Sequence, residues 1–91
     1  MILISYDIKD DKLRTKFAKF IKKFGNRVQY SVFEIKHSET MLNKIKVAIS
    51  NEFETKFTKD DSVFIFETSK TCKITRFGYA KDDNSDVVIV E

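Results

Sequence analysis

The sequence ILISYD at residues 2–7 is a short apolar run that ends in an aromatic residue and a carboxylate. A short, unbroken apolar run predicts a central strand of a sheet. A carboxylate at the end of such a strand is costly unless a charged or hydrogen-bonding group meets it. Asp7 is therefore a candidate site residue. Two roles stay open for it: capping the turn that follows, or holding a metal ion.

A basic amphipathic helix is predicted directly after this strand. Asp10 and Asp11 open it and suit the positive end of the helix dipole. Gly25 is the expected stop of the helix. Its apolar residues fall at helical spacing on one stripe, namely Leu13, Phe17, Phe20, Ile21 and Phe24. The basic residues on and around it are candidates for salt-sensitive contacts to phosphates: Lys9, Lys12, Arg14, Lys16, Lys19, Lys22, Lys23 and Arg27.

The charge of the chain is unevenly distributed. The net charge is +3, but residues 1–46 hold eleven Lys or Arg against five Asp or Glu, whereas residues 47–91 hold six against nine. This asymmetry indicates a polyanion contact in the first half, and simple solubility explains it equally well. For the acids of the second half, ordinary solvation is expected: Asp60, Asp61, Asp82, Asp83 and Asp86.

The rest of the chain predicts a single ferredoxin-like domain over residues 1–91. Residues 27–35 change their apolar phase near Val32, which indicates a bent strand pair centred on residues 29–31. Ser38 caps a second helix, whose buried stripe is Met41, Leu42, Ile45, Ala48, Ile49 and Phe53. Strands follow at residues 62–68, 73–77 and 86–91. This order predicts an α+β fold, ferredoxin-like βαββαβ with an extra C-terminal strand.

The predicted strand at residues 86–91 follows the ferredoxin-like βαββαβ unit, which is complete without it. Residues 79–91 therefore form a C-terminal extension, whose apolar strand could pair with the sheet edge of a second chain. That interpretation predicts a homodimer. The alternative is that the strand pairs with its own sheet.

Few residues could carry chemistry. His37 and Cys72 are the only histidine and cysteine, so one chain can assemble neither a zinc site nor a disulfide. A lone cysteine, no visible signal peptide and no stretch of transmembrane length lead us to expect a cytoplasmic protein without membrane contact. The strand aromatics lie in dense apolar runs that look like core, so no RNA-recognition pattern is expected. Carboxylates remain, and two Asp7 side chains across a twofold axis could hold one Mg²⁺.

Two segments resemble the CRISPR-associated protein 2 family. They are SYDIKDDKLR at residues 5–14 and GNRVQYSVFE at residues 25–34. The resemblance implies a homodimer at the centre of the CRISPR adaptation complex, where it binds duplex DNA beside the integrase subunits. It also implies a Mg²⁺-dependent endonuclease acting on RNA or duplex DNA, as some members are described.

The same resemblance assigns roles to individual residues. It makes Asp7 the metal ligand, and it ties Tyr6, Arg14, Arg27 and Phe33 to the activity. A further position that is commonly Arg in the family is Lys16 here, which keeps the charge but loses the planar fork. A toxin-type ribonuclease resembling the VapD group is the alternative, against which the motif at residues 27–34 argues.

Overall fold

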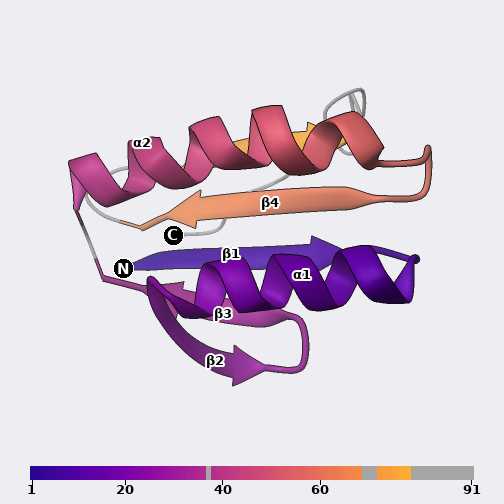
Figure 1. Cartoon of the computed structure of the whole chain (residues 1–91). Coiled ribbons are helices and arrows are strands. Elements are labelled where there is room, and N and C mark those ends of the chain that lie inside the picture. The colour runs from indigo at the N-terminus through magenta and orange to yellow at the C-terminus, as the bar shows by residue number, and fades with distance from the viewer. Residues whose placement is uncertain (37, 69–71, 79–91) are drawn as a thin grey trace.

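This computed structural model describes residues 1–36, 38–68 and 72–78, which form a sheet and two α-helices (Figure 1). The predicted order of strand, helix, two strands, helix and strand is confirmed, and a fifth strand follows it. The elements are β1 (Ile2–Asp7), α1 (Asp11–Lys22), β2 (Gly25–Gln29), β3 (Val32–Ile35), α2 (Glu39–Ala48), β4 (Ser62–Glu67) and β5 (Lys73–Gly78).

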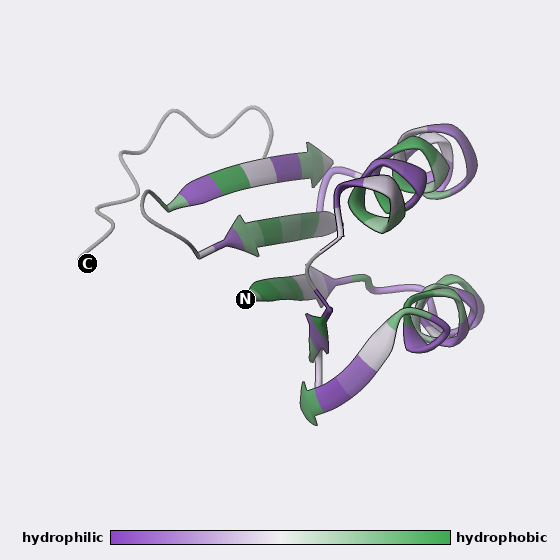
Figure 2. Ribbon diagram, turned by 90° about the vertical axis from the view of Figure 1, so that its left-hand side faces the viewer, coloured by the Kyte–Doolittle hydropathy of each residue, from purple (hydrophilic) through white to green (hydrophobic). Residues whose placement is uncertain are grey.

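All five strands join one antiparallel sheet in the order β2-β3-β1-β4-β5. The first four have the ferredoxin-like arrangement, and β5 is added beside β4. Both helices lie on the same side of the sheet (Figure 2). The predicted fold class is thereby confirmed, with β5 at the position expected for the short strand at 73–77. The C-terminal extension at 79–91, its strand at 86–91 and His37 lie outside the described residues.

The core lies between the sheet and the two helices. Alternate residues of β1 face the helices, and Ile2, Ile4 and Tyr6 are buried there. The helices meet them with the predicted stripes. Their buried members are Leu13, Phe17, Ile21, Leu42 and Ile45, and the partly buried Phe20 and Phe24 pack alongside. None of the described helices is long and apolar enough to cross a membrane.

The chain stays helical beyond α2. A π-helical turn (Ile49–Phe53) and a 3₁₀ turn (Glu54–Lys56) continue it. These turns keep both Ile49 and Phe53 buried, so the apolar stripe extends past the regular helix as the sequence predicts. The predicted cap is also present, because Ser38 Oγ accepts a hydrogen bond from the backbone N–H of Met41 at 3.3 Å.

The expectation that Gly25 stops α1 is wrong. The helix ends at Lys22 with Lys23 as its C-cap, and Gly25 is the first residue of β2, without a positive φ. A Cβ on Gly25 would lie 2.0 Å from the carbonyl oxygen of Glu34 in β3. Glycine is needed here because two strand backbones approach closely.

The bent strand pair is confirmed. β2 ends at Gln29 and β3 begins at Val32, so Tyr30 and Ser31 lie between the two strands. The register shifts between Arg27 and Gln29, where β2 has one residue more than its partner. This bulge accounts for the change of apolar phase in the sequence. It belongs to a hairpin whose tip leaves Tyr30 73% exposed.

Candidate nucleic-acid and metal site

The residues assigned to the activity meet in one open groove. Its walls are the end of β1, one side of α1 and the β2–β3 hairpin, and its volume is about 1040 Å³. Tyr6, Asp7, Arg14, Arg27 and Phe33 all line it. These residues come from three parts of the fold, which come together because β3 pairs directly with β1.

Asp7 ends β1 and is exposed to solvent. Its side chain is 65% exposed and forms an ion pair with Lys9 Nζ at 3.3 Å. An exposed pair of this kind contributes little to stability. Strand alternation places Asp7 on the same face as Leu3 and Ser5, away from the helices. The carboxylate can therefore exchange Lys9 for another cation at small cost.

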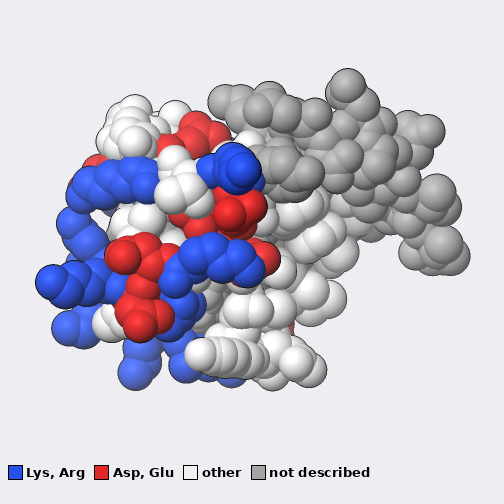
Figure 3. All heavy atoms as spheres, turned by 90° about the vertical axis from the view of Figure 1, so that its right-hand side faces the viewer, with Lys and Arg blue, Asp and Glu red and all other residues white. Residues whose placement is uncertain are grey.

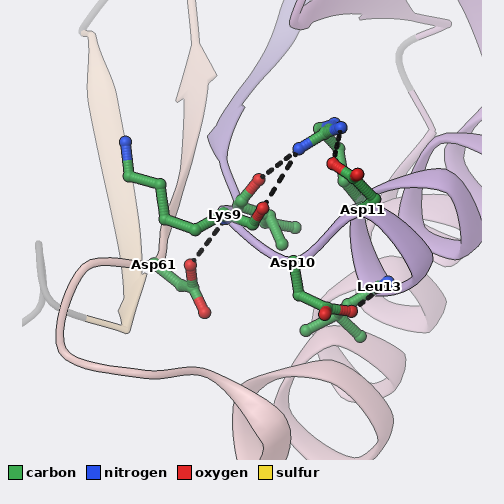
Figure 4. A network of polar contacts seen from close by, with 7 residues as sticks. Lys9, Asp10, Asp11, Leu13 and Asp61 are labelled. Carbon is green, nitrogen blue, oxygen red and sulfur yellow. Dashed lines mark hydrogen bonds and ion pairs between the residues drawn. The ribbon is translucent and has the colours of Figure 1, made fainter.

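The turn after β1 is capped by Asp61, so the capping role considered for Asp7 is wrong. Asp61 Oδ1 accepts a hydrogen bond from the backbone N–H of Lys9 at 2.9 Å (Figure 4). Its Oδ2 accepts another from the N–H of Thr58 at 2.8 Å. Asp61 is 1% exposed, which overturns the expectation that this acid is solvated. Its burial is possible because both carboxylate oxygens are hydrogen-bonded.

The other two acids near Asp7 serve the helix start, as predicted. The Asp10 side chain caps α1 by accepting a hydrogen bond from the N–H of Leu13 at 2.9 Å. Asp11 lies in the first turn and pairs with Arg14 (Figure 4). Within the described residues, neither acid is left over to serve as a second carboxylate beside Asp7.

Arg14 is held by the turn between β1 and α1. Its Nη1 donates hydrogen bonds to the carbonyl oxygens of Ile8 at 3.1 Å and Lys9 at 3.3 Å, and its Nη2 donates to Asp11. The hydrogen bond with Asp11 raises the pKa of the guanidinium. Arg14 therefore keeps its charge at the groove while it braces the backbone next to Asp7.

Two buried rings position Arg27. Phe33 and Tyr6 are 1% and 5% exposed, and their rings stack with centroids 6.2 Å apart. The Arg27 guanidinium lies 5.1 Å from the centroid of Phe33. This cation–π contact directs an otherwise exposed side chain toward the groove. Phe33 has no group that titrates, so its contribution is to place its neighbours.

The eight basic residues predicted to contact phosphates divide into two groups. Lys9, Arg14, Lys19, Lys22 and Arg27 line the groove, whereas Lys12, Lys16 and Lys23 do not. Figure 3 shows Lys and Arg gathered on the side that the helices occupy, with acidic side chains among them. Because that surface is mixed in charge, the lining of the groove distinguishes a binding site better than the overall charge does.

Sequence reasoning missed Tyr30 as a groove residue. It lies at the tip of the hairpin, is 73% exposed and lines the groove. The available signal was its place at the centre of the predicted bend, because a residue at a tight turn between strands projects away from the core.

The described residues of one chain do not bring enough ligands together to hold a metal ion. No group of three or more His, Cys, Asp or Glu side chains could hold an ion anywhere in residues 1–36, 38–68 and 72–78. Mg²⁺ prefers six oxygen ligands, and Asp7 supplies a single carboxylate. A magnesium ion at Asp7 would therefore take its further oxygen ligands from water and from a second copy of Asp7 or substrate phosphates.

Fold and groove together define a small ferredoxin-like protein with a basic groove around a strand-end carboxylate. The model of a known family, CRISPR associated protein Cas2, matches residues 1–76, and the chain belongs to this family. The chain is 33% identical to CRISPR-associated endoribonuclease Cas2 2 of Methanospirillum hungatei over 91 residues, which covers 97% of each protein.

Two further matches agree with this assignment. CRISPR-associated endoribonuclease Cas2 4 of Rhodospirillum rubrum is 35% identical over 81% of this chain, which spans 57% of that relative's length. The crystal structure of the hypothetical protein TT1823 from Thermus thermophilus matches with a TM-score of 0.65 and 31% identity. That match covers 75% of this chain and 79% of the Thermus chain.

Proposed function

We propose that this chain is the nucleic-acid-binding, homodimeric subunit of a cytoplasmic CRISPR adaptation complex, beside the integrase subunits. We propose that the dimer is also a Mg²⁺-dependent endonuclease. The observation that carries both roles is the groove, which is lined by five basic residues and by Asp7. Family membership supports the CRISPR role over that of a VapD-like toxin, and the names of the relatives support a nuclease.

The groove suits the backbone of a nucleic acid. Lys9, Lys19, Lys22 and Arg27 are exposed at its walls, where each could neutralise a phosphate. Such contacts carry no sequence information, and the described residues offer no obvious set of side chains for reading base edges. Binding is therefore expected to be independent of sequence, as the capture of foreign DNA requires.

The proposed dimer rests on the sheet face that the helices leave uncovered. Leu3 of β1 pairs with Phe66 of β4, which pairs in turn with Ile74 of β5, so these apolar residues share that face. The ring of Phe64 stacks on that of Phe66 with centroids 5.8 Å apart. No described helix covers this face (Figure 2). A second copy stacked there would bury it and would bring two Asp7 side chains toward each other.

Magnesium completes the proposed nuclease. Two Asp7 carboxylates across a twofold axis would supply the oxygen ligands that one chain lacks. The bound ion would polarise a phosphoryl oxygen or activate a water. The chain itself would supply Arg27 and Arg14 to hold the phosphate charge, with Phe33 and Tyr6 keeping Arg27 and β1 in place.

The hairpin tip favours a single-stranded RNA for cleavage. Tyr30 is exposed and lines the groove, as Arg27 does. An unpaired base can stack on such a ring, whereas the bases of a duplex are already stacked on one another. Duplex DNA remains the ligand proposed for the adaptation role, because it requires the phosphate contacts alone.

The binding role is tested by two matched double variants of α1. Lys19→Ala with Lys22→Ala removes lysines that line the groove, and Lys12→Ala with Lys16→Ala removes two that do not. Duplex affinity is measured across a range of salt concentrations. The groove variant should bind more weakly and lower the salt slope by roughly one for each phosphate that its lysines no longer neutralise. Equal weakening in the two variants would show that general charge is responsible, which contradicts a binding groove.

Association with the integrase and the nuclease activity are tested in separate experiments. The dimer should co-purify with the integrase expressed from the same locus, and a neighbouring antitoxin in place of an integrase would favour the toxin alternative. Asp7→Ala should abolish cleavage with Mg²⁺ and leave duplex binding intact.

A further inference from the structure

Asp61 is the one charged side chain that the described part of the chain buries completely. It is 1% exposed, although its neighbour Asp60 is exposed. Removing a carboxylate from water costs several kcal/mol unless strong hydrogen bonds replace the lost hydration. Asp61 has two such bonds from backbone N–H groups, those of Lys9 and Thr58. The buried carboxylate therefore has a structural role, which is to hold these two backbone segments in place.

Of the two bonds, the one to Lys9 explains the burial. The bond from Thr58 closes a local turn, which the N–H of Asp61 also closes by donating to the carbonyl of Thr58 at 3.1 Å. An exposed Asp or Ser could serve such a turn equally well. The bond from Lys9 instead spans 52 residues and joins the segment before β4 to the turn after β1.

Asp61 and Arg14 hold this turn from two sides. The N–H of Lys9 donates to Asp61, and the carbonyl of Lys9 accepts from Arg14 (Figure 4). The carbonyl of Ile8 accepts from Arg14 as well, and the Ile8 side chain is buried. Asp7 immediately precedes these braced residues. The direction in which the Asp7 backbone leaves β1 is therefore set by two side chains from other elements.

The end of β5 packs closely against the backbone of Asp61. Gly78 has a φ of +73°, and a Cβ added to it would lie 2.3 Å from the carbonyl oxygen of Asp61. The N–H of Gly78 donates to Glu54 Oε2 at 2.8 Å. Close backbone packing of this kind leaves the segment carrying Asp61 little freedom to move. A strand outside the ferredoxin-like unit thus contributes to the geometry at the groove.

We propose that Asp61 is a positioning residue for the site at Asp7. It holds the Lys9 backbone from the segment before β4 and so fixes where the Asp7 carboxylate and the Lys9 ammonium lie. This inference rests on the proposed nuclease function. Asp61 itself does not line the groove, so it acts through the turn and touches no substrate.

The test compares Asp61→Asn with Asp60→Asn in the full-length dimer. Both substitutions remove one negative charge from adjacent positions, but Asp60 is exposed and its side chain holds no backbone N–H in the described structure. The two N–H groups donate to different oxygens of Asp61. Asp61→Asn replaces one of these oxygens by an NH₂ group, so a side chain that keeps the bond from Thr58 presents a donor to the N–H of Lys9. Asp61→Ser is a second variant in case the first folds poorly, because its short hydroxyl can close the local turn without reaching Lys9.

Two measurements are made on each variant. Amide hydrogen exchange should be faster at Lys9 in Asp61→Asn, while the amides of the β1 ladder stay protected. The kcat for cleavage of single-stranded RNA with Mg²⁺ should fall by about 10- to 100-fold, the range seen when supports of functional ligands are removed. KM should change less than kcat because Lys19, Lys22 and Arg27 still line the groove, and Asp60→Asn should match the wild type in both measurements.

The outcomes separate this inference from the function on which it rests. If Lys9 exchanges faster but kcat is unchanged, or if kcat and KM change together with global loss of protection, Asp61 is only structural and the inference is overturned. If Asp7→Ala cleaves as well as the wild type, or if the wild type does not cleave, the proposed nuclease function is wrong. This inference, which rests on that function, is then wrong as well. Loss of cleavage in Asp7→Ala with full activity in Asp61→Asn overturns the inference alone.

Discussion

Tyr30 is the residue that we expect to distinguish between the two proposed ligands, single-stranded RNA and duplex DNA. Its ring is exposed in the groove, while Phe33, three residues later, is buried beneath Arg27. An exposed aromatic beside a cation can stack on an unpaired base, and it adds little to the binding of a duplex held by its phosphates. The residue therefore matters to the proposed RNA cleavage more than to the proposed role in adaptation.

Replacing Tyr30 by alanine should weaken the binding of single-stranded RNA. Stacking of one base is worth about 1–3 kcal/mol, so the affinity should fall roughly 5- to 150-fold. Duplex DNA affinity should change much less, and Tyr30→Phe should keep the RNA affinity because it keeps the ring. Both ligands are measured by titration at one fixed salt concentration. Equal weakening for RNA and duplex would contradict base stacking.

For single residues, the sequence identified side chains that the fold brings to one groove, and their roles stay predictions. Asp7, Arg14 and Arg27 could be named because two local motifs carry them, and the fold brings all three to one groove. The role of Asp61 could not be inferred locally, because its partner Lys9 lies 52 residues away. An Asp-Asp pair ahead of a strand looks like a solvated loop until the chain folds and buries one member.

The β2–β3 hairpin is the element that gives the groove one of its walls. Gly25 begins it at a point where the backbone of β3 is too close for any side chain. The bulge between Arg27 and Gln29 then turns the strand before the tip. Together these features set how Arg27 and Tyr30 stand relative to α1.

Gly25→Ala should destabilise the protein. The added methyl group would meet the Glu34 carbonyl, and overpacking of this kind costs about 1–3 kcal/mol. The free energy of unfolding is measured with urea at one protein concentration, since association also affects stability. Asn26→Ala, at the exposed neighbouring position, is the control and should change stability far less. An unaffected Gly25→Ala variant would show that the two strands can separate without cost.

Element boundaries followed from the sequence where a local pattern determines them. The stripe of α1 and the Ser38 cap are properties of a single helix, and the structure has both. The role of Gly25 was misjudged because a glycine after a helix resembles a stop, whereas its actual constraint is the β3 backbone. A contact between two elements, such as this one, cannot be recognised from the sequence pattern within one of them.

For the whole molecule, the decisive question is whether two copies share the site. The apolar sheet face and Asp7 lie on the same side of β1, so a partner stacked on that face would meet both. The fold class could be predicted because it depends on the order and type of the elements. The homodimer stays a prediction, which the C-terminal strand, the family resemblance and the uncovered sheet face each support.

The proposed twofold arrangement predicts efficient cross-linking at Asp7. Asp7→Cys in a Cys72→Ser background leaves one thiol per chain, and a short thiol–thiol reagent should join two chains through it. Val47→Cys, at an exposed position on α2 on the other side of the sheet, is the control and should react without joining the chains. The products are resolved by size under denaturing conditions. Equal cross-linking at both positions, or none at Asp7→Cys, would contradict a pair of Asp7 residues at the axis.

The most direct test of the central claim is the activity of Asp7→Ala. Wild type, Asp7→Ala and Asp60→Ala are assayed with and without Mg²⁺ for cleavage of single-stranded RNA and for duplex binding. We expect Asp7→Ala to lose Mg²⁺-dependent cleavage while it keeps duplex affinity and the dimer, and we expect Asp60→Ala to behave as the wild type. Mg²⁺-dependent cleavage that survives in Asp7→Ala would contradict a nuclease site built around this carboxylate.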